Sequence, residues 1–333
     1  MTIDRLCVVL ANDIVLPNEK RLAAKADFPF EVIRLPSDAS REACEDAVAA
    51  ADAIVTVAFN HPSQQAPRLR LVQTQAAGFE RVDMACLPDR VTVCNAFGHT
   101  RAIAEYAVMT MLMWTHEWKA VEASFRAGSW KYSGSMVGPL RSELNSKTVG
   151  VLGFGEMGAE IARRSHAMGS RILICARNPD KAVASGLAER VYGLDELDAF
   201  LGVCDFVIVC VALTPETTGL IDAARLARMK RAAVLVNVAR GPVVDEAALY
   251  AALTRGDIAG AVIDVWWQYP DAANPGRRGS RFPFHELDNV LITPHSSGWT
   301  EQMMDRRWDQ IVANLGALYR GQPLRNVVRP GKG

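Results

Sequence analysis

A glycine-rich segment in the middle of the chain constrains the fold more than any other feature. Residues 149–158 read Val-Gly-Val-Leu-Gly-Phe-Gly-Glu-Met-Gly, a GxGxxG pattern that follows a strand-like apolar run and opens a helical pattern. Gly153 would permit a tight turn, Gly155 would let the backbone approach a pyrophosphate, and Gly158 would let the helix pack closely on the strand. The free amides at the start of that helix would bind phosphate oxygens. We therefore expect a dinucleotide-binding domain here; the alternative is a glycine-rich turn that binds nothing.

Short β-branched runs alternate with helical patterns on both sides of this segment, which is typical of βαβ units and a parallel sheet. Strands are predicted at Arg5–Leu10, Phe30–Leu35, Ala53–Phe59, Arg70–Thr74, Val91–Asn95, Thr148–Gly153, Arg171–Ala176, Phe206–Leu213, Ala233–Val238, Ala259–Val265 and Val290–Thr293. Helices are predicted at Ser40–Ala51, Thr100–Ala127, Glu156–Met168, Asp222–Met229, Asp245–Thr254 and Thr300–Tyr319. The alternating strands and helices from Thr148 onward predict a Rossmann-type, doubly wound parallel sheet. Those before residue 96 predict a smaller flavodoxin-like α/β domain.

Two domains are expected from the length of 333 residues. The last predicted helix has no sheet of its own, so we expect it to pack back on the first domain. The chain would then cross between the domains twice. The predicted boundaries give one domain of residues 1–98 and 297–333 and a second domain of residues 99–296.

The charge balance argues against some classes of partner. Lys+Arg and Asp+Glu both number 37, so the net charge is +0, whereas proteins that bind nucleic acids or anionic membranes usually carry a basic excess. The longest apolar runs are far shorter than the about 18 residues of a membrane helix, and the N-terminus does not resemble a signal peptide. Seven cysteines without CxxC spacing indicate reduced thiols and no metal site. We therefore expect a cytoplasmic protein.

The end of Arg171–Ala176, the predicted strand that follows the glycine loop, bears on the choice of cofactor. Ala176 stands where an NAD-selective site usually carries Asp or Glu, and Arg177 follows it. A guanidinium would pair with the 2′-phosphate of NADP(H), whereas a carboxylate would repel it. The pattern therefore predicts a preference for NADP(H), with NAD(H) possible. In the alternative interpretation, Arg177 is a solvated surface charge.

Three polar residues each end a later strand-like run: Arg240, Asp264 and His295. The carboxyl edge of an open parallel sheet is where such folds bind ligands. A cation and an imidazole that meet there could bind a carboxylate and move a proton. An isolated histidine would more often be a capped interior residue, but here it accompanies Arg240, Asp264 and the glycine loop.

With these motifs the sequence resembles the D-isomer-specific 2-hydroxyacid dehydrogenases, from about Leu69 to Val328. The motifs that carry the resemblance, besides the glycine loop, are Ala76–Phe79, Ala104-Glu105, Leu213–Thr217, Asn237–Gly241, Ile263–Val265 and Pro294-His295. The resemblance implies that the domain of residues 1–98 and 297–333 binds substrate and that residues 99–296 form the NAD(P)-binding domain. It also implies a homodimer through the cofactor domains, to which Trp130–Leu144 contributes.

The resemblance assigns roles to individual residues. Arg240 looks like the arginine that binds the substrate carboxylate and polarises its oxo group, and His295 looks like the acid/base. The amides of Ala77 and Gly78 look like the opposing carboxylate cradle, with His99 as a further substrate-binding residue. Cofactor contacts are expected from the glycine loop and from the strand ends around it, with Asp264 and the backbone at Val238 at the nicotinamide carboxamide: Gly153, Gly155, Glu156, Met157, Gly158, Ala176, Arg177, Val211, Ala212, Thr217, Val238, Ala239, Arg240, Asp264, His295 and Gly298.

Three positions depart from the family pattern. Tyr269 stands five residues after Asp264, where the usual members carry a Glu that is hydrogen-bonded to the catalytic histidine. His99 replaces an Asn that helps to fix substrate in many members, and Ala212 replaces a common Pro. We expect Tyr269 to act beside His295 as part of the catalytic group. Formate dehydrogenases carry a neutral Gln at the position of Tyr269, and they share the Trp that follows the Asp-Val pair and the Ser-Gly that follows the histidine.

These observations predict an enzyme that reduces a small 2-oxo acid of the glyoxylate or hydroxypyruvate type with NADPH. Two alternatives stay open. One is the oxidation of a small anion in the manner of a formate dehydrogenase, and the other is a catalytically weak, NAD(P)-sensing module that binds proteins. The expected partners are a small-molecule substrate and a second copy of the chain, without nucleic acid or membrane.

Overall fold

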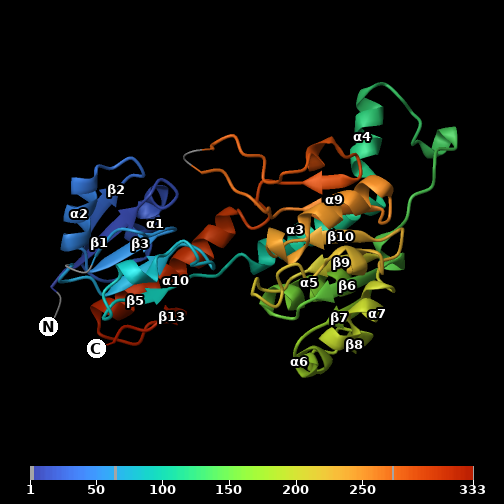
Figure 1. Ribbon diagram of the computed structural model, residues 1–333. Helices are drawn as coiled ribbons and strands as arrows, with labels where there is room; N and C mark the ends of the chain where they lie inside the picture. The colour runs from blue at the N-terminus through green and yellow to red at the C-terminus, as the bar shows by residue number, and fades with distance from the viewer. Residues whose placement is uncertain (1–3, 64–65, 272–273, 333) are drawn as a thin grey trace. The chain divides into compact units, whose positions relative to one another are not determined.

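The computed structural model describes residues 4–63, 66–271 and 274–332, and it divides into two compact units. Unit 1 comprises Met1–Gly98 and Thr300–Gly333, and unit 2 comprises His99–Trp299. Each unit contains its own parallel sheet with helices (Figure 1). The first crossing lies between the same two residues that the sequence predicts, and the second lies three residues later than predicted.

The sheet of unit 1 has the strand order β13-β5-β4-β3-β1-β2. The strands are β1 (Leu6–Ala11), β2 (Phe30–Leu35), β3 (Ala53–Thr56), β4 (Leu71–Thr74), β5 (Thr92–Cys94) and β13 (Val327–Arg329). Without β13 the order is 2-1-3-4-5 with all strands parallel, which is the flavodoxin-like arrangement that the sequence predicts. Strand β13 was not among the predicted strands, and it pairs antiparallel with β5. A three-residue strand is too short to produce a periodic pattern.

Helices cover both faces of this sheet. Helix α2 (Arg41–Ala50) packs on one face, and α1 (Glu19–Lys25) and α10 (Glu301–Tyr319) pack on the other. Trp308 of α10 is fully buried against the sheet. The final helix therefore belongs to the first unit, as its sequence predicts.

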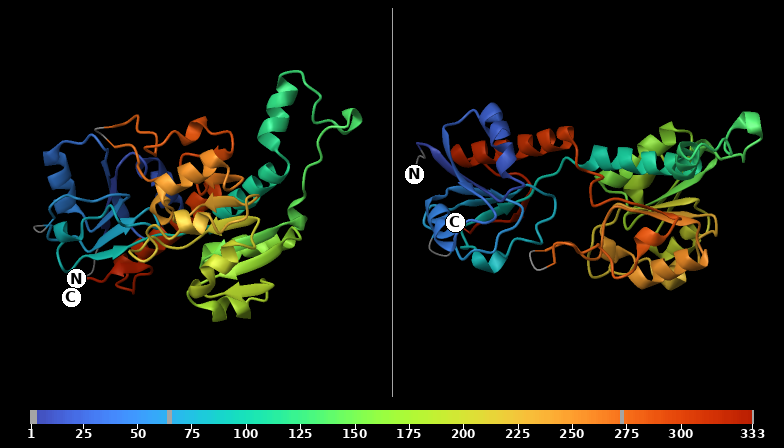
Figure 2. Two further views of the ribbon diagram at one scale, coloured as in Figure 1. Left: turned by 45° about the vertical axis from the view of Figure 1, so that its right-hand side comes forward. Right: turned by 90° about the horizontal axis from the view of Figure 1, so that it is seen from above.

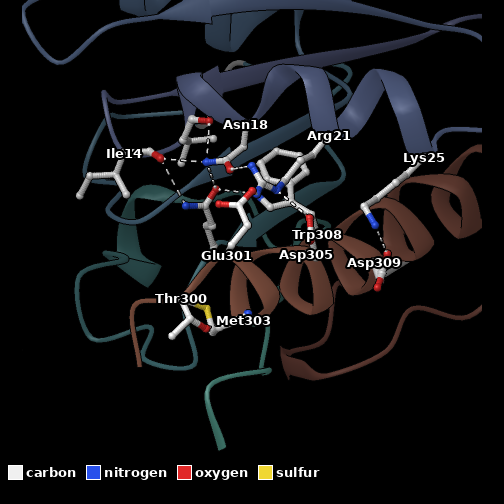
Figure 3. Close-up of polar contacts among 12 residues, drawn as sticks. Ile14, Asn18, Arg21, Lys25, Thr300, Glu301, Met303, Asp305, Trp308 and Asp309 are labelled. Carbon is white, nitrogen blue, oxygen red and sulfur yellow. Dashed lines mark hydrogen bonds and ion pairs between the residues drawn. The ribbon is translucent and has the colours of Figure 1, made fainter. Parts of the chain in front are cut away.

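Polar contacts attach α10 to α1 and to the sheet (Figure 3). Arg21 of α1 pairs with Glu301 and Asp305, and Lys25 pairs with Asp309. On the buried side, the Trp308 indole N–H donates to Gln75 Oε1 at 2.9 Å. These contacts place the N-terminal half of α10 level with the residues that follow β4.

The sheet of unit 2 is parallel throughout and has the strand order β12-β11-β10-β9-β6-β7-β8. The strands are β6 (Thr148–Leu152), β7 (Arg171–Cys175), β8 (Arg190–Tyr192), β9 (Phe206–Val209), β10 (Val234–Asn237), β11 (Gly260–Ile263) and β12 (Val290–Ile292). Counted along the chain within the unit, this is the order 3-2-1-4-5-6 of the Rossmann fold with one further strand beside the sixth. The predicted doubly wound sheet is confirmed.

Two layers of helices bury the faces of this sheet. Apolar side chains of α3 (Thr100–Thr115), α5 (Glu156–Ala167) and α6 (Pro179–Ala184) form the core on one face. Those of α7 (Leu197–Leu201), α8 (Ala223–Leu226) and α9 (Glu246–Arg255) form the core on the other, and α3 and α9 lie on opposite sides of the sheet (Figure 2). Within the described residues, no helix is both long and apolar enough to cross a membrane.

The single long helix predicted over Thr100–Ala127 is two helices. Helix α3 ends at Thr115, and α4 (Trp118–Arg126) begins after Glu117, whose φ of 50° lies in the left-handed region. The residues around this break are all compatible with a helix, so the sequence pattern continues across it. The environment differs on the two sides, because α3 packs on α5 whereas α4 has no buried residue and projects from the rest of unit 2 (Figure 1).

Several strands are shorter than predicted, and the longest difference has a visible cause. The apolar run Phe206–Leu213 is a strand only as far as Val209. Cys210 and Val211 then lie against Gly153, so closely that a Cβ atom on that glycine would stand 3.0 Å from both. The chain leaves the sheet there in order to pass the glycine loop.

Candidate active site

The glycine loop has the geometry that dinucleotide binding requires. Gly153 follows β6 and has a φ of 100°, a conformation that favours glycine. A Cβ atom on Gly158 would collide with the carbonyl oxygen of Gly153, so the helix can approach the strand only because residue 158 has no side chain. In contrast, no atom lies within 4 Å of the place where a Cβ of Gly155 would stand. The backbone at the start of α5 therefore faces open space, and the residues present fit a pyrophosphate at this helix N-terminus.

The segments that follow β7 and β9 adjoin the glycine loop in the candidate cofactor site. Ala176 is buried at the end of β7, and Arg177 behind it is exposed. Thr217 closes the turn that follows β9, because its hydroxyl donates to the Ala212 carbonyl at 2.6 Å and accepts from the Thr214 amide at 2.8 Å. A hydrogen bond from Thr214 lowers the pKa of Glu216, and the charge of Arg177 adds to this effect. Arg177 therefore lies within electrostatic range of the turn.

Arg240 follows β10 in a turn that Asn237 organises. The Asn237 amide group donates to the Arg240 carbonyl at 3.0 Å, and its Oδ1 accepts from the Ala239 amide at 3.1 Å. A Cβ atom on Gly241 would collide with the backbone of Trp266, so only glycine fits after the arginine. The guanidinium donates from Nη1 to the Ala239 carbonyl at 2.9 Å, and within the described residues it has no carboxylate partner. Its remaining N–H groups are therefore available to an anionic ligand.

Asp264 is fully buried at the end of β11 and holds the turn that carries His295. Its Oδ1 accepts from the Thr293 hydroxyl at 2.5 Å and from the Ser296 amide at 2.8 Å. Its Oδ2 accepts from the amide of Ser297 at 3.1 Å and also from the Ser297 hydroxyl. This carboxylate therefore fixes the residues on both sides of the histidine. The predicted contact of Asp264 with a nicotinamide stays a prediction.

Tyr106 extends this network from helix α3. Its hydroxyl lies 2.7 Å from the Thr293 hydroxyl. Because Thr293 uses its single proton on the Asp264 carboxylate, Tyr106 must be the donor of this bond. Helix α3 is thereby linked through Thr293 to the turn after β12.

Tyr269 and His295 are brought together as the sequence count predicts. The Tyr269 Oη lies 2.8 Å from His295 Nδ1, and the Trp266 amide donates to the same Oη at 3.2 Å. If the imidazole is neutral with its proton on Nε2, Tyr269 can donate to Nδ1 and still accept from Trp266. The contact therefore favours the tautomer that presents an N–H at Nε2. The φ of 57° at His295 is a left-handed conformation, which is held by the bonds of Asp264 to its neighbours.

The surroundings of the imidazole disfavour its protonation overall, and burial is the largest cause. Loss of surrounding water lowers the pKa of His295 below its ordinary value, the Asp264 carboxylate raises it, and the charge of Arg240 lowers it again. Burial raises the pKa of Tyr269, so its hydroxyl is neutral at working pH. Tyr269 therefore contacts the ring without adding the negative charge that a glutamate would bring.

The other predicted site residues are distributed over the two units. His99 stands at the start of α3 in unit 2, where a Cβ atom on Gly298 would lie 3.2 Å from its side chain. Ala77 and Gly78 lie in unit 1, in the segment after β4, and the Asn95 side chain donates to the Ala77 carbonyl at 2.7 Å. The roles that the resemblance gives to these residues stay predictions.

Sequence reasoning missed four residues that hold the turn around His295 in place, namely Tyr106, Thr293, Ser296 and Ser297. The two serines directly follow His295 in the sequence. The buried carboxylate of Asp264, which needs hydrogen-bond donors, was the signal that could have pointed to them. Tyr106 precedes Thr293 by 187 residues, and no local pattern connects the two.

Comparison with known proteins identifies the family. The family model for the D-isomer specific 2-hydroxyacid dehydrogenase, NAD binding domain, matches residues 108–297. The glyoxylate reductase of Pyrococcus furiosus is 34% identical to this chain over 305 residues, which cover 89% of this chain and 88% of that protein. The chain belongs to the D-isomer-specific 2-hydroxyacid dehydrogenase family.

Solved structures agree with this assignment. An NADPH-dependent glyoxylate/hydroxypyruvate reductase from Sinorhizobium meliloti, in complex with NADP and sulfate, is 26% identical, with a TM-score of 0.77 over 97% of this chain and 98% of that chain. A D-isomer specific 2-hydroxyacid dehydrogenase from Xanthobacter autotrophicus, in complex with NADPH and MES, is 29% identical, with a TM-score of 0.74 over 97% of this chain and 98% of that chain. As a member of this family, the protein is an NAD(P)-dependent dehydrogenase.

The environment of His295 leads to a prediction for a pair of variants, Tyr269→Glu and Tyr269→Gln. If His295 supplies the proton for reduction of an oxo acid, kcat/KM should fall as the pH rises through the pKa of His295, which lies below the ordinary value. A carboxylate beside Nδ1 would favour the charged ring, so Tyr269→Glu should move this fall to higher pH. A glutamine has the length of a glutamate without its charge, so Tyr269→Gln should not move the fall in kcat/KM to higher pH. Equal pH profiles for the two variants would show that charge at residue 269 does not reach the imidazole.

Proposed function

We propose that this protein reduces a small 2-oxo acid of the glyoxylate or hydroxypyruvate type to the 2-hydroxy acid with NADPH. The observation that carries the proposal is the juxtaposition of two groups at the carboxyl edge of the Rossmann sheet. Arg240 offers a guanidinium without a carboxylate partner among the described residues, and His295 has its Nδ1 bound by Tyr269. The relatives named glyoxylate reductase favour reduction of an oxo acid over oxidation of formate.

The reaction needs three functions, of which the cofactor provides one. A bound nicotinamide dinucleotide supplies the hydride. Arg240 binds the substrate carboxylate and stabilises the oxo oxygen as negative charge develops there. His295 donates a proton to that oxygen from Nε2, since Nδ1 is already bound to Tyr269.

The cofactor preference rests on the end of β7. Ala176 leaves no carboxylate at the position that would bind a ribose 2′-hydroxyl, and the exposed Arg177 offers a partner for a 2′-phosphate. The relative from Sinorhizobium meliloti is an NADPH-dependent enzyme, which is consistent with this preference. We therefore propose NADP(H) as the preferred cofactor, with NAD(H) possible.

The assembly that we propose is a homodimer through the segment that follows α3. Large apolar side chains in and after α4 are exposed: Trp118, Phe125, Trp130, Met136, Val137 and Leu140. Val137 and Leu140 are 93% and 98% exposed, and such a patch on one projecting segment is typical of a protein interface. A second copy of the chain would cover it.

The functional proposal predicts different kinetic defects for two variants. Arg240→Ala should raise KM and lower kcat, because carboxylate binding and stabilisation of the developing charge are both lost. His295→Ala should mainly lower kcat, by about 10²–10⁴-fold for a lost general acid. Initial rates with NADPH and a panel of 2-oxo acids, together with formate and NADP⁺, test this. Normal oxo-acid reduction by His295→Ala would overturn the assignment, and turnover of formate alone would favour the alternative oxidation. Cofactor binding without turnover of any substrate would favour the protein-binding module.

The cofactor proposal predicts a selective loss in Arg177→Ala. The variant should bind NADPH more weakly, by roughly 1.5–3 kcal/mol for a hydrogen bond to a charged group, while its affinity for NADH changes little. Dissociation constants for both cofactors, measured by quenching of protein fluorescence, give the comparison. An equal loss for both cofactors would mean that Arg177 does not contact the 2′-phosphate.

The dimer proposal predicts that charge on the exposed apolar segment separates the chains. The double variant Val137→Asp, Leu140→Asp should sediment as a monomer, whereas the unaltered protein should sediment with twice the mass of one chain. Val183→Asp is the matched control, because Val183 is 63% exposed on α6 and lies outside the segment. If the double variant still sediments with the mass of the unaltered assembly, the interface lies elsewhere on the chain.

A further inference from the structure

Glu246, in the first turn of helix α9 of unit 2, is a buried carboxylate that the proposed reaction does not use. The residue is 6% exposed. Its Oε1 accepts from the Ser280 hydroxyl at 2.8 Å and from the Arg281 amide at 2.9 Å, and its Oε2 accepts from Arg281 Nε at 2.9 Å. A carboxylate is costly to bury unless other groups replace the water around it. Glu246 therefore binds the segment of residues 277–284 to the start of α9.

Aromatic side chains attach the same segment at two further places. Phe282 stacks on Tyr250 of α9, with ring centroids 5.1 Å apart. Phe284 is fully buried and stacks on Trp267, with ring centroids 5.4 Å apart. The Trp267 indole N–H in turn donates to the carbonyl of Val244, which precedes α9, at 2.8 Å. Stacked rings contribute beyond the area they bury, so polar and apolar contacts together fix segment 277–284 on α9.

Segment 277–284 also binds the backbone on both sides of the Tyr269 side chain. The Gln268 amide donates to the Gly279 carbonyl at 2.9 Å, and Arg277 Nη1 donates to the Tyr269 carbonyl at 3.3 Å. The same Nη1 donates to Asp271 Oδ2 at 2.9 Å, which keeps the guanidinium beside the carbonyl. The place of Tyr269 is therefore set by a segment that lies later in the chain.

Gly279 brings this segment against the residue that orients the Tyr269 hydroxyl. Its φ is 84°, and a Cβ atom there would stand 2.6 Å from the Trp266 ring, so only glycine fits. Trp266 is held by both of its N–H groups, because its amide donates to Tyr269 Oη at 3.2 Å and its indole donates to the Thr293 carbonyl at 2.9 Å. The segment thus contacts both the backbone of Tyr269 and the tryptophan that binds its hydroxyl.

We propose that Glu246 is a positioning residue: by fixing segment 277–284 on α9, its carboxylate holds Tyr269 against His295. The inference rests on the proposed role of His295 as proton donor, to which it adds the group that keeps the imidazole contact in place. Tyr269 is 42% exposed and lies on the long connection between β11 and β12, so its own burial holds it weakly. Its bond of 2.8 Å to His295 Nδ1 joins two separate segments and needs both to be fixed. Asp264 fixes one of them, and Glu246 fixes the other.

A simpler role for Glu246 would be to stabilise the start of α9, because acidic residues in a first turn interact favourably with the helix dipole. That role requires neither burial nor bonds to segment 277–284. Asp245 already caps the helix, since its side chain accepts from the Ala248 amide at 2.7 Å. Asp245→Ala is therefore the matched control: it removes a carboxylate from the start of the same helix and leaves the bonds between Glu246 and the segment in place.

The kinetic test is a double-mutant cycle between Glu246→Ala and Tyr269→Ala. If Glu246 acts through Tyr269, Glu246→Ala should lower kcat by roughly 3- to 10-fold, the size expected for one lost hydrogen bond, and change KM for the oxo acid little. In protein that already carries Tyr269→Ala, it should have no further effect on kcat. Asp245→Ala should leave kcat unchanged in both backgrounds. A loss of kcat that is equally large with and without Tyr269 would overturn the inference.

A titration of the imidazole separates this inference from the proposed function, because it needs no turnover. Carbon-13 NMR of protein with labelled histidine reports the pKa of His295, and His295→Gln identifies its signal. Burial is the main cause that lowers this pKa, while Asp264 raises it and Arg240 lowers it. Release of the segment admits water to the ring, so Glu246→Ala should raise the pKa of His295 and Asp245→Ala should not. An unchanged titration in folded Glu246→Ala protein would contradict the proposed path.

Two milder variants cover the case in which Glu246→Ala does not fold. Glu246→Gln keeps an oxygen for the bonds from Ser280 and the Arg281 amide but loses the ion pair, so it should retain part of the lost kcat. Arg281→Met removes the same ion pair from the solvent side and should raise the pKa of His295 by less than Glu246→Ala does.

The two proposals can fail separately. Should the unaltered protein reduce no 2-oxo acid, the functional proposal fails, while the titration of His295 still decides whether Glu246 positions Tyr269. If the unaltered protein reduces glyoxylate and every folded variant of Glu246 and Arg281 keeps both kcat and the pKa of His295, this inference is overturned and the functional proposal stands.

Discussion

The arrangement of the candidate active site depends on one buried carboxylate. Asp264 receives hydrogen bonds from a hydroxyl before His295 and from two backbone amides after it. Hydrogen bonds to a charged group contribute about 1.5–3 kcal/mol each, and the removal of one partner of a buried charge costs more than the bond itself. This set of bonds can therefore hold the histidine in a left-handed conformation that an isolated chain would rarely adopt. The imidazole is presented by the turn, and the turn is held by Asp264.

The same residue shapes the electrostatics around the imidazole. Asp264 is the negative charge that raises the pKa of His295, but its oxygens are already occupied by hydrogen bonds from the turn. Arg240 acts in the opposite direction, and Tyr269 is neutral. A site of this kind favours the binding of anions, since its accessible charge is positive. The same positive charge makes the imidazole harder to protonate, so anion binding and proton donation have opposing requirements. A family member with a glutamate in place of Tyr269 would balance them differently.

Much of the fold could be predicted from the sequence because its strongest patterns are local. The glycine loop lies within ten residues, and the buried strands of both sheets are short β-branched runs between turns. The break at Glu117 could not be predicted, since its neighbours are compatible with a helix and only the loss of packing after α3 ends it. Strand β13 was missed because three residues give no periodicity, and its pairing with β5 spans most of the chain.

The residues of the candidate site also fall into those that local patterns predict and those that only packing determines. Arg240, Asp264 and His295 could be found because parallel strands bring their carboxyl ends to one edge, so residues that are far apart in sequence share a location. Tyr269 could be placed because a fixed count of five residues from Asp264 carries it to the ring, where its hydroxyl lies 2.8 Å from Nδ1. The bond from Tyr106 to Thr293 follows from the packing of α3 in unit 2 and not from any local spacing. What the sequence could show of this site is therefore the candidate reacting groups and the carboxylate that anchors their turn, whereas the more distant partners that complete the network are set by packing.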